Sequence, residues 1–211
     1  VTPERPVLNE PFPRFTYREA IDRFGSDKPD VRYGMELQDL GELAKESGFR
    51  VFESVLDAGG RVFGFAASGL GGYTRKQVDE LTEMARKAGA GGLVWLALDV
   101  EGGIRGSIVK IVGEQMAHDL AAEAGAQNGD LVLIVADKDI VAQEVLGTLR
   151  VELAERHDMF DRSIISYVWV YQFPMYHWDE DNARWDATHN PFSAVLPEDE
   201  ELLATVSGDP L

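Results

Sequence analysis

The stretch "GDLVLIVADKDIVAQEVLGTLRVEL" (Gly129–Leu153) decides the fold of this chain, because it joins two elements that need each other. Its first part, Asp130 to Asp137, is an almost continuous apolar run and predicts a buried strand. Residues 138–157 follow directly and predict a long helix with Asp137 as its N-cap. A buried strand that leads into a long helix predicts a sheet covered by helices.

A weaker copy of the same arrangement lies upstream. Both "ARKAGAGGLVWLALD" (residues 85–99) and "AAEAGAQNGDLVLIVAD" (residues 121–137) run from a helix through an Ala-Gly-Ala stop into a buried strand that ends on Asp. Two related units stacked on one sheet are the simplest interpretation of this internal echo.

The neighbouring residues predict further helices and strands. A capping box of Thr74 and Gln77 begins an amphipathic helix that ends at Gly89, and residues 113–125 predict another helix. We expect two segments around "LDAGG" to pair as a β-hairpin, and a strand to follow a glycine-rich turn. These three predicted strands are residues 49–55, 60–67 and 102–112. The predicted fold class is α+β, with a mixed or antiparallel sheet and helices packed on one face.

The N-terminal part differs in texture from this centre. Residues 1–15 contain four prolines, which predict an extended segment outside any helix. Thr16 and Glu19 then form a second capping box, and Gly25 is placed to end the short helix that the box begins.

The C-terminal part is aromatic and acidic. Residues 163–178 predict a long aromatic strand, and "RWDATH" (residues 184–189) predicts a returning strand that completes a hairpin. Residues 196–203, "LPEDEELL", predict a short acidic helix that begins at the proline.

Composition narrows the class of protein. The formal net charge is −17, and the pI is near 4.5, which opposes strong attraction to phosphate backbones or anionic lipid. There is no cysteine, so disulfides and thiolate metal sites are excluded, and the cytoplasm is the expected location. No apolar run approaches the roughly 20 residues that span a bilayer. Because the chain begins without Met, we expect a segment of a longer protein.

The search for a catalytic constellation gives candidates with ordinary structural explanations. The sequence lacks a Walker loop, a zinc helix and a nucleophile elbow. "GLGGYT" (residues 69–74) precedes a helix, where a phosphate could bind, but a mobile connecting loop is the preferred interpretation. Asp137 could belong to a carboxylate site at the sheet edge, but its predicted role as an N-cap already explains it.

The four histidines were considered in the same way. His118 lies within a predicted helix and His157 at a helix end, and both have structural interpretations. His177 and His189 lie on the two strands of the predicted hairpin among acidic residues, but we do not expect a metal site there, because a third fixed ligand is lacking. From composition and spacing alone, the chain is a soluble acidic α+β domain without a complete catalytic site.

Three separated stretches resemble one family. "PFPRFTYREAIDRFGSDKPDVRYGMEL" (residues 11–37) resembles the segment after the second class II motif of bacterial-type aspartyl-tRNA synthetases, and Gly129–Leu153 resembles the end of their inserted GAD domain. "YVWVYQFPMYHWDEDNARWDATHNPFS" (residues 167–193) resembles the strand pair by which the chain re-enters the catalytic fold. The resemblance runs through essentially all 211 residues in order.

This resemblance implies an architecture and a function. Residues 36–160 would be a GAD-like insertion domain, and residues 1–35 and 161–211 would be strips of the class II catalytic domain on either side. The family joins L-aspartate to ATP, forms aspartyl-adenylate and transfers the aspartyl group to tRNA. ATP and Mg would be bound by the full-length parent and neither by the fragment, which would be inactive alone. The fragment would be a monomer without membrane contact, and the parent would be a homodimer.

The resemblance also gives one candidate site residue. His189 matches the first histidine of the family's His-His-Pro-Phe motif and would contribute to the L-aspartate pocket, whereas Asn190 replaces the second histidine. Asparagine keeps hydrogen bonding but cannot carry a positive charge. Ser26, Asp27 and Lys28 match a loop motif of the family, and a turn-forming role explains them as well as a functional one.

Two further functions remain open. One is a stand-alone GAD-like binding or scaffold domain, and the other is the insertion of a tRNA amidotransferase B subunit, against which "THNPF" argues. The aromatic side chains of the C-terminal part distinguish the first from a synthetase segment: they should find partners within a stand-alone chain and remain uncovered in a segment. These side chains are Tyr167, Trp169, Tyr171, Phe173, Trp178 and Trp185.

Overall fold

The computed structural model describes residues 5–179, 182–188, 197–199 and 201. At its centre lies an antiparallel sheet with the strand order β3-β4-β7-β5-β6. The strands are β3 (Gln38–Asp39), β4 (Arg61–Ala67), β5 (Val94–Leu98), β6 (Ile104–Gly106) and β7 (Leu131–Asp137). The predicted buried strand is β7, and it is central: β4 pairs with it from Leu131 to Asp137, and β5 pairs with its other edge.

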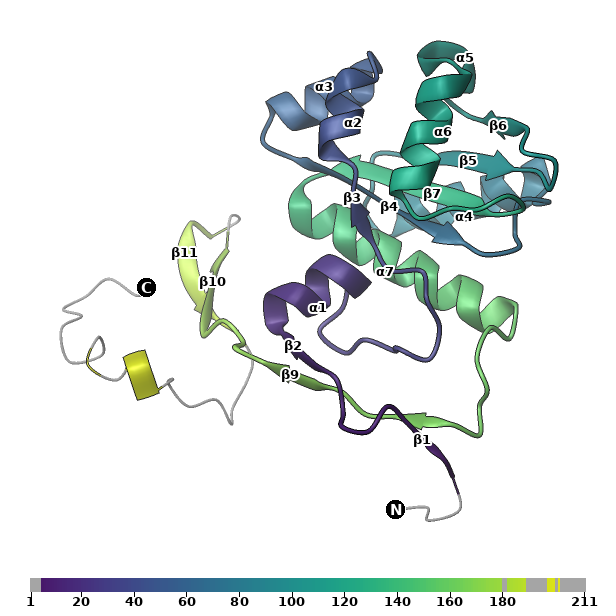
Figure 1. The fold of residues 1–211 in the computed structure, drawn as a ribbon. Coiled ribbons are helices and arrows are strands. Elements are labelled where there is room, and N and C mark those ends of the chain that lie inside the picture. The colour runs from purple at the N-terminus through teal and green to yellow at the C-terminus, as the bar shows by residue number, and fades with distance from the viewer. Residues whose placement is uncertain (1–4, 180–181, 189–196, 200, 202–211) are drawn as a thin grey trace.

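Helices cover both faces of this sheet (Figure 1). The helices on one face are α4 (Arg75–Lys87) and α7 (Asp139–Arg156), and those on the other are α2 (Gly41–Glu46), α3 (Arg50–Asp57), α5 (Val109–Val112) and α6 (Glu114–Glu123). Along β7, Leu131 and Leu133 join the core with α4 and α7, whereas Val132 and Ile134 join the opposite core. The predicted α+β class with an antiparallel sheet is confirmed. The expectation of helices on one face is wrong, because β7 is apolar on both faces and each face needs a cover.

The predicted hairpin partner at residues 49–55 is a helix instead of a strand. In α3 the Phe52 side chain is fully buried, and its ring lies 5.0 Å from that of Phe49. Residues three apart are neighbours on a helix, and Phe49 and Leu56 pack in the same core as Phe52. The aromatic and β-branched content of this segment favoured a strand, but its apolar side chains follow the helical period. The other half of the predicted hairpin, β4, is confirmed as a strand.

The two capping boxes are confirmed. Thr16 caps α1 (Tyr17–Phe24), Glu19 bonds back to the Thr16 backbone, and Gly25 follows the helix with φ of 65°. Thr74 caps α4 in the same way with Gln77. Satisfied N–H groups at the first turn set where each helix starts, which explains why these boundaries could be predicted.

Two local predictions in the centre are wrong. Asp137 does not cap α7: its Oδ2 accepts a bond of 3.0 Å from the Gly91 amide, and Lys138 occupies the N-cap position. The carboxylate therefore stabilises the turn before β5. Residues 102–112 give only the short strand β6, and the chain then turns into α5.

The internal echo corresponds to two helix-strand units, α4–β5 and α6–β7. In each, a glycine with positive φ follows the helix, Gly89 at 109° and Gly125 at 81°. The two strands are antiparallel neighbours in one sheet, and the two helices lie on opposite faces. The common sheet was predicted, and the opposite placement of the helices was not.

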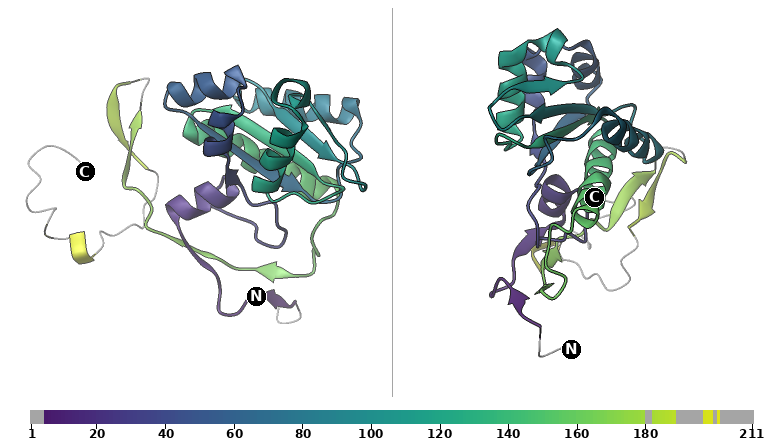
Figure 2. Two further views of the ribbon diagram at one scale, coloured as in Figure 1. Left: turned by 45° about the horizontal axis from the view of Figure 1, so that its top comes forward. Right: turned by 90° about the vertical axis from the view of Figure 1, so that its right-hand side faces the viewer.

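The two ends of the chain lie outside the sheet and its helices. α1 packs against α7, and the strands at residues 7–8, 14–16 and 169–171 lie on the far side of α1 from the sheet, whereas those at residues 176–179 and 184–187 lie to one side (Figures 1 and 2). The predicted strand at 163–178 is divided into β8 (Ile165–Ser166), β9 (Trp169–Tyr171) and β10 (Tyr176–Asp179). Gln172 follows β9 with φ of 55°, which interrupts an extended chain. In the predicted acidic helix, Pro197–Asp199 form a short 3-10 turn, and most of the rest lies outside the described residues.

Candidate functional site

The two ends of the chain meet in parallel strand pairs. β1 (Val7–Leu8) pairs with β8, and β2 (Arg14–Thr16) pairs with β9, although about 150 residues separate the partners in sequence. The amide of Ile165 donates to the Pro6 carbonyl at 3.0 Å, and that of Trp169 donates to Pro13 at 2.9 Å. In the described part of the chain, each pair is a sheet of two strands, so its outer edges are open.

One face of the β2–β9 pair is covered by α1. Phe15, Ala20 and Phe24 form a small core, and the half-buried Val168 and Val170 pack against it. The rings of Phe15 and Phe24 meet edge to face, with centroids 5.3 Å apart. Thr16 ends β2 and caps α1, so this strand and its covering helix follow from one local motif.

The opposite face is aromatic and exposed. Side chains alternate along β9, so Trp169 and Tyr171 point away from the core that Val170 joins. Trp169 is 61% exposed, and the Arg14 guanidinium lies over the Tyr171 ring, 5.2 Å from its centroid. We call the exposed apolar side chains of the C-terminal part the aromatic surface. Its residues are Tyr167, Trp169, Tyr171, Met175, Tyr176, Trp178 and Trp185. Large apolar side chains that are exposed in such number within one segment indicate an interaction surface.

The hairpin of β10 and β11 (Arg184–Ala187) extends the aromatic surface. The two strands are antiparallel, as predicted, with Trp178 opposite Trp185. Their rings touch edge to face with centroids 5.7 Å apart, yet both remain about half exposed. His177 is exposed and lies opposite Asp186. His189, the predicted aspartate-binding residue, and its neighbour Asn190 lie outside the described residues.

The loop after α1 is built by its own side chains. The carboxylate of Asp30 accepts several hydrogen bonds from Arg32, the shortest at 2.6 Å, and the Arg32 guanidinium lies 4.1 Å from the Phe160 ring centroid. Burial raises the pKa of Asp30, but the hydrogen bonds from Arg32 outweigh it, and the pKa of Asp30 lies below its ordinary value. The Ser26 hydroxyl accepts from the Lys28 amide at 3.1 Å, a turn-forming bond.

Asp27 and Lys28 form an ion pair at the tip of the same loop. The side chain of Lys28 is 85% exposed, and its Nζ lies 3.1 Å from Asp27 Oδ1. An exposed pair of this kind contributes little to stability. Turn formation therefore accounts for Ser26, and the exposed Lys28 is left accessible to a partner.

The glycine-rich loop at residues 69–74 is a packed structural element. The Gly69 amide donates to Asp130 Oδ1 at 2.8 Å, and the Gly71 amide donates to the Gly129 carbonyl at 2.7 Å. A Cβ on Gly71 would lie 2.1 Å from the Leu98 carbonyl oxygen, so only glycine fits there. These amides are used inside the protein, which excludes the phosphate interpretation for Gly69 and Gly71 and replaces the expected mobile loop with an anchored one.

The remaining histidines have structural positions. His118 is half-buried within α6. His157 follows α7 as predicted, and its Nε2 lies 2.6 Å from the Tyr73 hydroxyl, a contact that sequence reasoning missed because 84 residues separate the partners. Tyr73 is buried, and desolvation raises its pKa.

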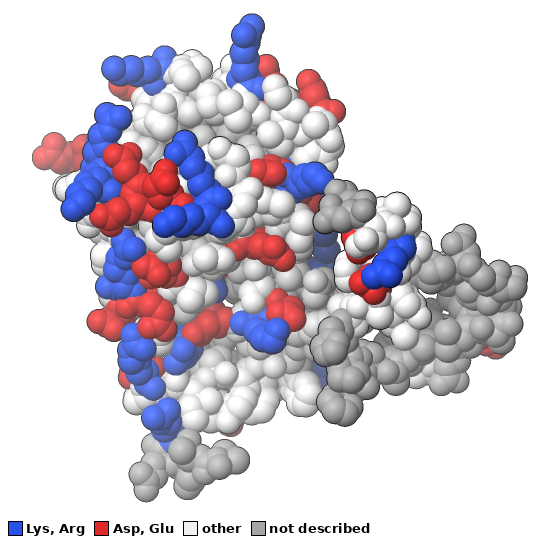
Figure 3. Space-filling view, turned by 180° about the vertical axis from the view of Figure 1, so that it is seen from behind, with Lys and Arg blue, Asp and Glu red and all other residues white. Residues whose placement is uncertain are grey.

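Positive and negative side chains are mixed on the surface of the described residues (Figure 3). On the face shown in Figure 3, Lys and Arg side chains are interspersed with those of Asp and Glu. The ion pairs of the described residues include Arg156–Glu152 at 2.7 Å. Among the described residues, no group of three or more His, Cys, Asp or Glu side chains could hold a metal ion. Within this same part of the structure, no helix is both long and apolar enough to cross a membrane.

In the described part of the chain, the fold is a layered α+β domain attached to paired strands with an exposed aromatic face. Residues 52–146 match the sequence model of the GAD domain. The matched range extends from α3 to the middle of α7 and contains β4, β5, β6 and β7.

The chain is also homologous to bacterial aspartate–tRNA(Asp/Asn) ligases. It is 45% identical over 196 residues to the ligase of Caldanaerobacter subterraneus subsp. tengcongensis, which is 93% of this chain and 33% of that protein. It is 45% identical over 199 residues to the Bacillus mycoides ligase and 42% identical over 208 residues to that of Rubrobacter xylanophilus, covering 94% and 99% of this chain and 34% of each relative. The chain spans about a third of the length of these relatives.

Proposed function

We propose that this chain is the GAD-bearing segment of a longer ligase that attaches L-aspartate to tRNA. The observation that carries the proposal is the pairing of the two chain ends in short parallel strands whose aromatic surface has no cover among the described residues. A two-stranded sheet is marginally stable in water, and more strands or a helix must support it. The remaining strands of a catalytic sheet would provide that support.

We divide the proposed segment into three parts. Residues 36–160 would be the inserted domain, and residues 1–35 and 161–211 would be the two strips of the catalytic domain. The sheet and its helices lie between β3 and α7, and the parallel pairs lie outside them, which supports this division.

ATP and Mg would be bound by parts of the longer protein outside this chain. ATP, when bound, supplies the activation of the aspartate carboxyl group. The longer protein would act in the cytoplasm as a homodimer, and the 211-residue chain alone would be a monomer without ligase activity. His189 would form part of the L-aspartate pocket.

The alternative of a stand-alone binding domain predicts that the aromatic side chains are covered within the chain. Phe173 does pack against the Tyr17 ring, with centroids 5.1 Å apart. The other five side chains named for this comparison are between 39% and 61% exposed, which favours the ligase segment.

The first test is aminoacylation by the longer protein. It should form aspartyl-tRNA from L-aspartate, ATP and tRNA, and assays with tRNA-Asp and tRNA-Asn would define its acceptors. His189→Ala should raise the KM for aspartate by about tenfold or more and leave that for ATP close to its original value. A folded longer protein that forms no aspartyl-tRNA would refute the proposal.

The second test measures whether the longer protein covers the aromatic surface. A variant with Trp169 as its only tryptophan should be strongly quenched by acrylamide in the 211-residue chain, because the side chain is 61% exposed. Quenching should fall severalfold in the longer protein. Equal quenching in both would favour the stand-alone domain.

A further inference from the structure

The helix α7 has a polar face that is buried against the loop after α1. Arg150 and Gln143 lie on this helix and are 1% and 0% exposed. An adjacent face of α7 packs on the sheet through residues such as Leu146 and Leu149. α7 therefore belongs to the core of the GAD domain and at the same time contacts the N-terminal strip.

Arg150 holds the loop through its carbonyl groups. Its Nη2 donates to the carbonyl oxygens of Asp30 at 2.6 Å and Tyr33 at 3.2 Å. Its Nε donates to those of Gly34 and Met35, each at 3.2 Å. The guanidinium also lies over the Tyr33 ring, 4.3 Å from its centroid.

The environment of Arg150 is unusual for a charged side chain. Burial lowers its pKa, and the negative charges of Asp30 and Glu36 only partly offset that effect. A buried charge is costly unless its hydrogen bonds are made, so the four carbonyl groups are required for the charge to be tolerated. The loop conformation and the buried charge depend on each other.

The loop conformation is one that the chain does not adopt readily. Met35 has φ of 63°, in the left-handed region that non-glycine residues avoid. Such a residue persists when its surroundings enforce it, and strained residues of this kind gather at functional positions. The Met35 carbonyl is bound by Arg150, and the next turn is fixed by the Leu37 amide, which donates to the Arg23 carbonyl at 2.8 Å.

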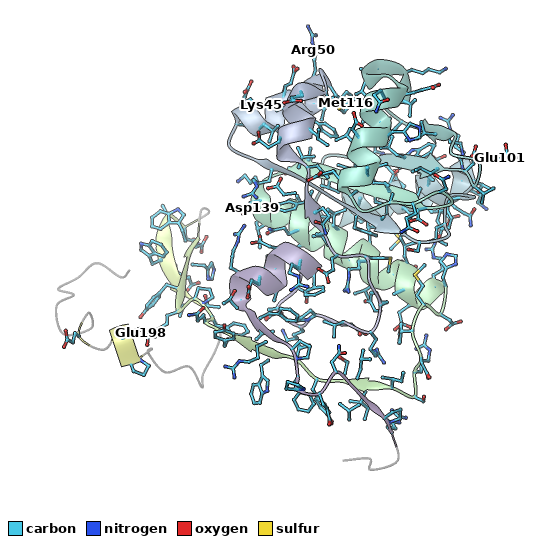
Figure 4. The ribbon with its side chains drawn as sticks, viewed as in Figure 1. Lys45, Arg50, Glu101, Met116, Asp139 and Glu198 are labelled. Atoms are coloured by element: carbon cyan, nitrogen blue, oxygen red, sulfur yellow. The ribbon has the colours of Figure 1, made fainter. Side chains whose placement is uncertain are left out.

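α1 is held on the same face of α7. Gln143 Nε2 donates to Asp22 Oδ1 at 2.6 Å, and Arg18 Nη2 lies 2.9 Å from Asp139 Oδ2 near the start of α7 (Figure 4). Since α1 directly follows β2, the line of contacts runs from the GAD sheet through α7 to the paired strands.

We propose that Arg150 is a positioning residue of the ligase, through which the GAD domain fixes the loop 26–37, α1 and the paired strands of the catalytic domain. This inference rests on the proposed function. It assigns the inserted domain a role in aligning the catalytic domain through α7, in addition to any contact it makes itself.

The contacts can be tested in the 211-residue chain without any activity. Arg150→Met is compared with Arg156→Met, because Arg156 lies on the same helix and its ion pairs are with Glu80 and Glu152. Hydrogen exchange at the Arg32 and Leu37 amides should become about tenfold faster or more in Arg150→Met, with exchange in β7 unchanged. Exchange that rises equally in the loop and in β7, or no more than in Arg156→Met, would overturn the proposal.

The consequence for catalysis is tested in the longer protein at a temperature where both variants are fully folded. Arg150→Met should lower kcat by about tenfold or more while the KM for tRNA changes little, because displaced catalytic groups mainly affect the chemical step. Arg150→Lys should restore only part of the rate, since a lysine cannot reproduce the fork of donors. Unchanged kcat in Arg150→Met would overturn the proposal.

The exchange experiment on the 211-residue chain and the kinetic experiment on the longer protein separate this inference from the proposed function. If the wild-type longer protein forms no aspartyl-tRNA, the proposed function fails and the exchange result still decides whether Arg150 holds the loop. If the wild type is active and Arg150→Met has the same kcat, the proposed function stands and the positioning role of Arg150 fails.

Discussion

Replacing Gly25 with alanine is expected to force α1 away from α7. Gly25 has φ of 65°, and a Cβ at this position would lie 2.1 Å from the Gln143 carbonyl oxygen and 2.8 Å from the Gly147 Cα. Backbone atoms of a helix cannot yield as a flexible side chain can. Gly147 is the matching contact, because a Cβ on it would lie 2.6 Å from the Gly25 carbonyl oxygen.

Gly48 provides a matched control for the magnitude. Its φ is 66°, nearly the same as that of Gly25, but a Cβ there would meet nothing within 4 Å. Gly48→Ala should therefore cost only the left-handed conformation, about 1–2 kcal/mol. Gly25→Ala should add an overpacking cost of about 1–3 kcal/mol for displacing α1.

The assay is urea unfolding of the 211-residue chain, combined with hydrogen exchange of the α1 amides. Gly25→Ala should lower the free energy of unfolding more than Gly48→Ala does, or release α1 locally and accelerate exchange at residues 21–24. If the two variants match in both measurements, the close approach of Gly25 and Gly147 is not present in solution, and the reasoning about α1 and α7 is refuted.

Three further predictions follow from the core, a carboxylate and a helix cap. Phe52→Ala should cost about 3–5 kcal/mol in urea unfolding, whereas Val51→Ala, at a side chain 51% exposed, should stay within about 0.5 kcal/mol; reversed values would favour a strand over α3. The pKa of Asp30 is depressed in the folded state, so the stability it contributes with Arg32 is present above its unfolded pKa of about 3.9 and is lost as the pH falls through the folded value. Asp30→Asn should therefore flatten the acid limb of stability against pH, and an unaltered limb would contradict the assignment. Thr74→Ala should cost about 1 kcal/mol by thermal unfolding and leave exchange outside α4 unchanged.

Local chemistry explains what could be predicted from the sequence. The helices that begin at Thr16 and Thr74 are specified within four residues by their capping boxes. The apolar run of β7 required burial on both sides, and the structure provides a core on each face. Such features depend on neighbours in sequence, so tertiary context did not override them.

The errors arose where long-range packing decides. Residues 49–55 have the composition of a strand, but Phe49, Phe52 and Leu56 reach one core only from a helix. The Asp137 carboxylate accepts hydrogen bonds from the amides of Lys138 and Gly91. The bond from Gly91, which is 46 residues away, cannot be foreseen from spacing. The Arg150 contacts could not be foreseen for the same reason, because 115 to 120 residues separate the partners.

The candidate site was predictable in part. The exposure of the aromatic side chains of residues 167–185 distinguishes a stand-alone domain from a segment of a longer protein, and most of these side chains are exposed. Their parallel pairing with the N-terminal strip could not be read from periodicity, because pairing between segments so far apart leaves no local signal. The predicted aspartate-binding residue, His189, stays a prediction.

The five-stranded sheet should be stable without the paired strands, whereas the paired strands depend on the sheet and its helices. The five strands of the sheet have helices on both faces, so this part of the chain completes its own core. In the described residues, the β2–β9 pair has a helix on one face only, and that helix, α1, is itself held by α7. Because a two-stranded sheet is marginal in water, the strips should keep their native pairing only while α7 holds α1 or while further strands cover the aromatic surface. Among the described residues the first of these supports acts alone, so loss of the Arg150 and Gly147 contacts should disorder the paired strands before it unfolds the sheet.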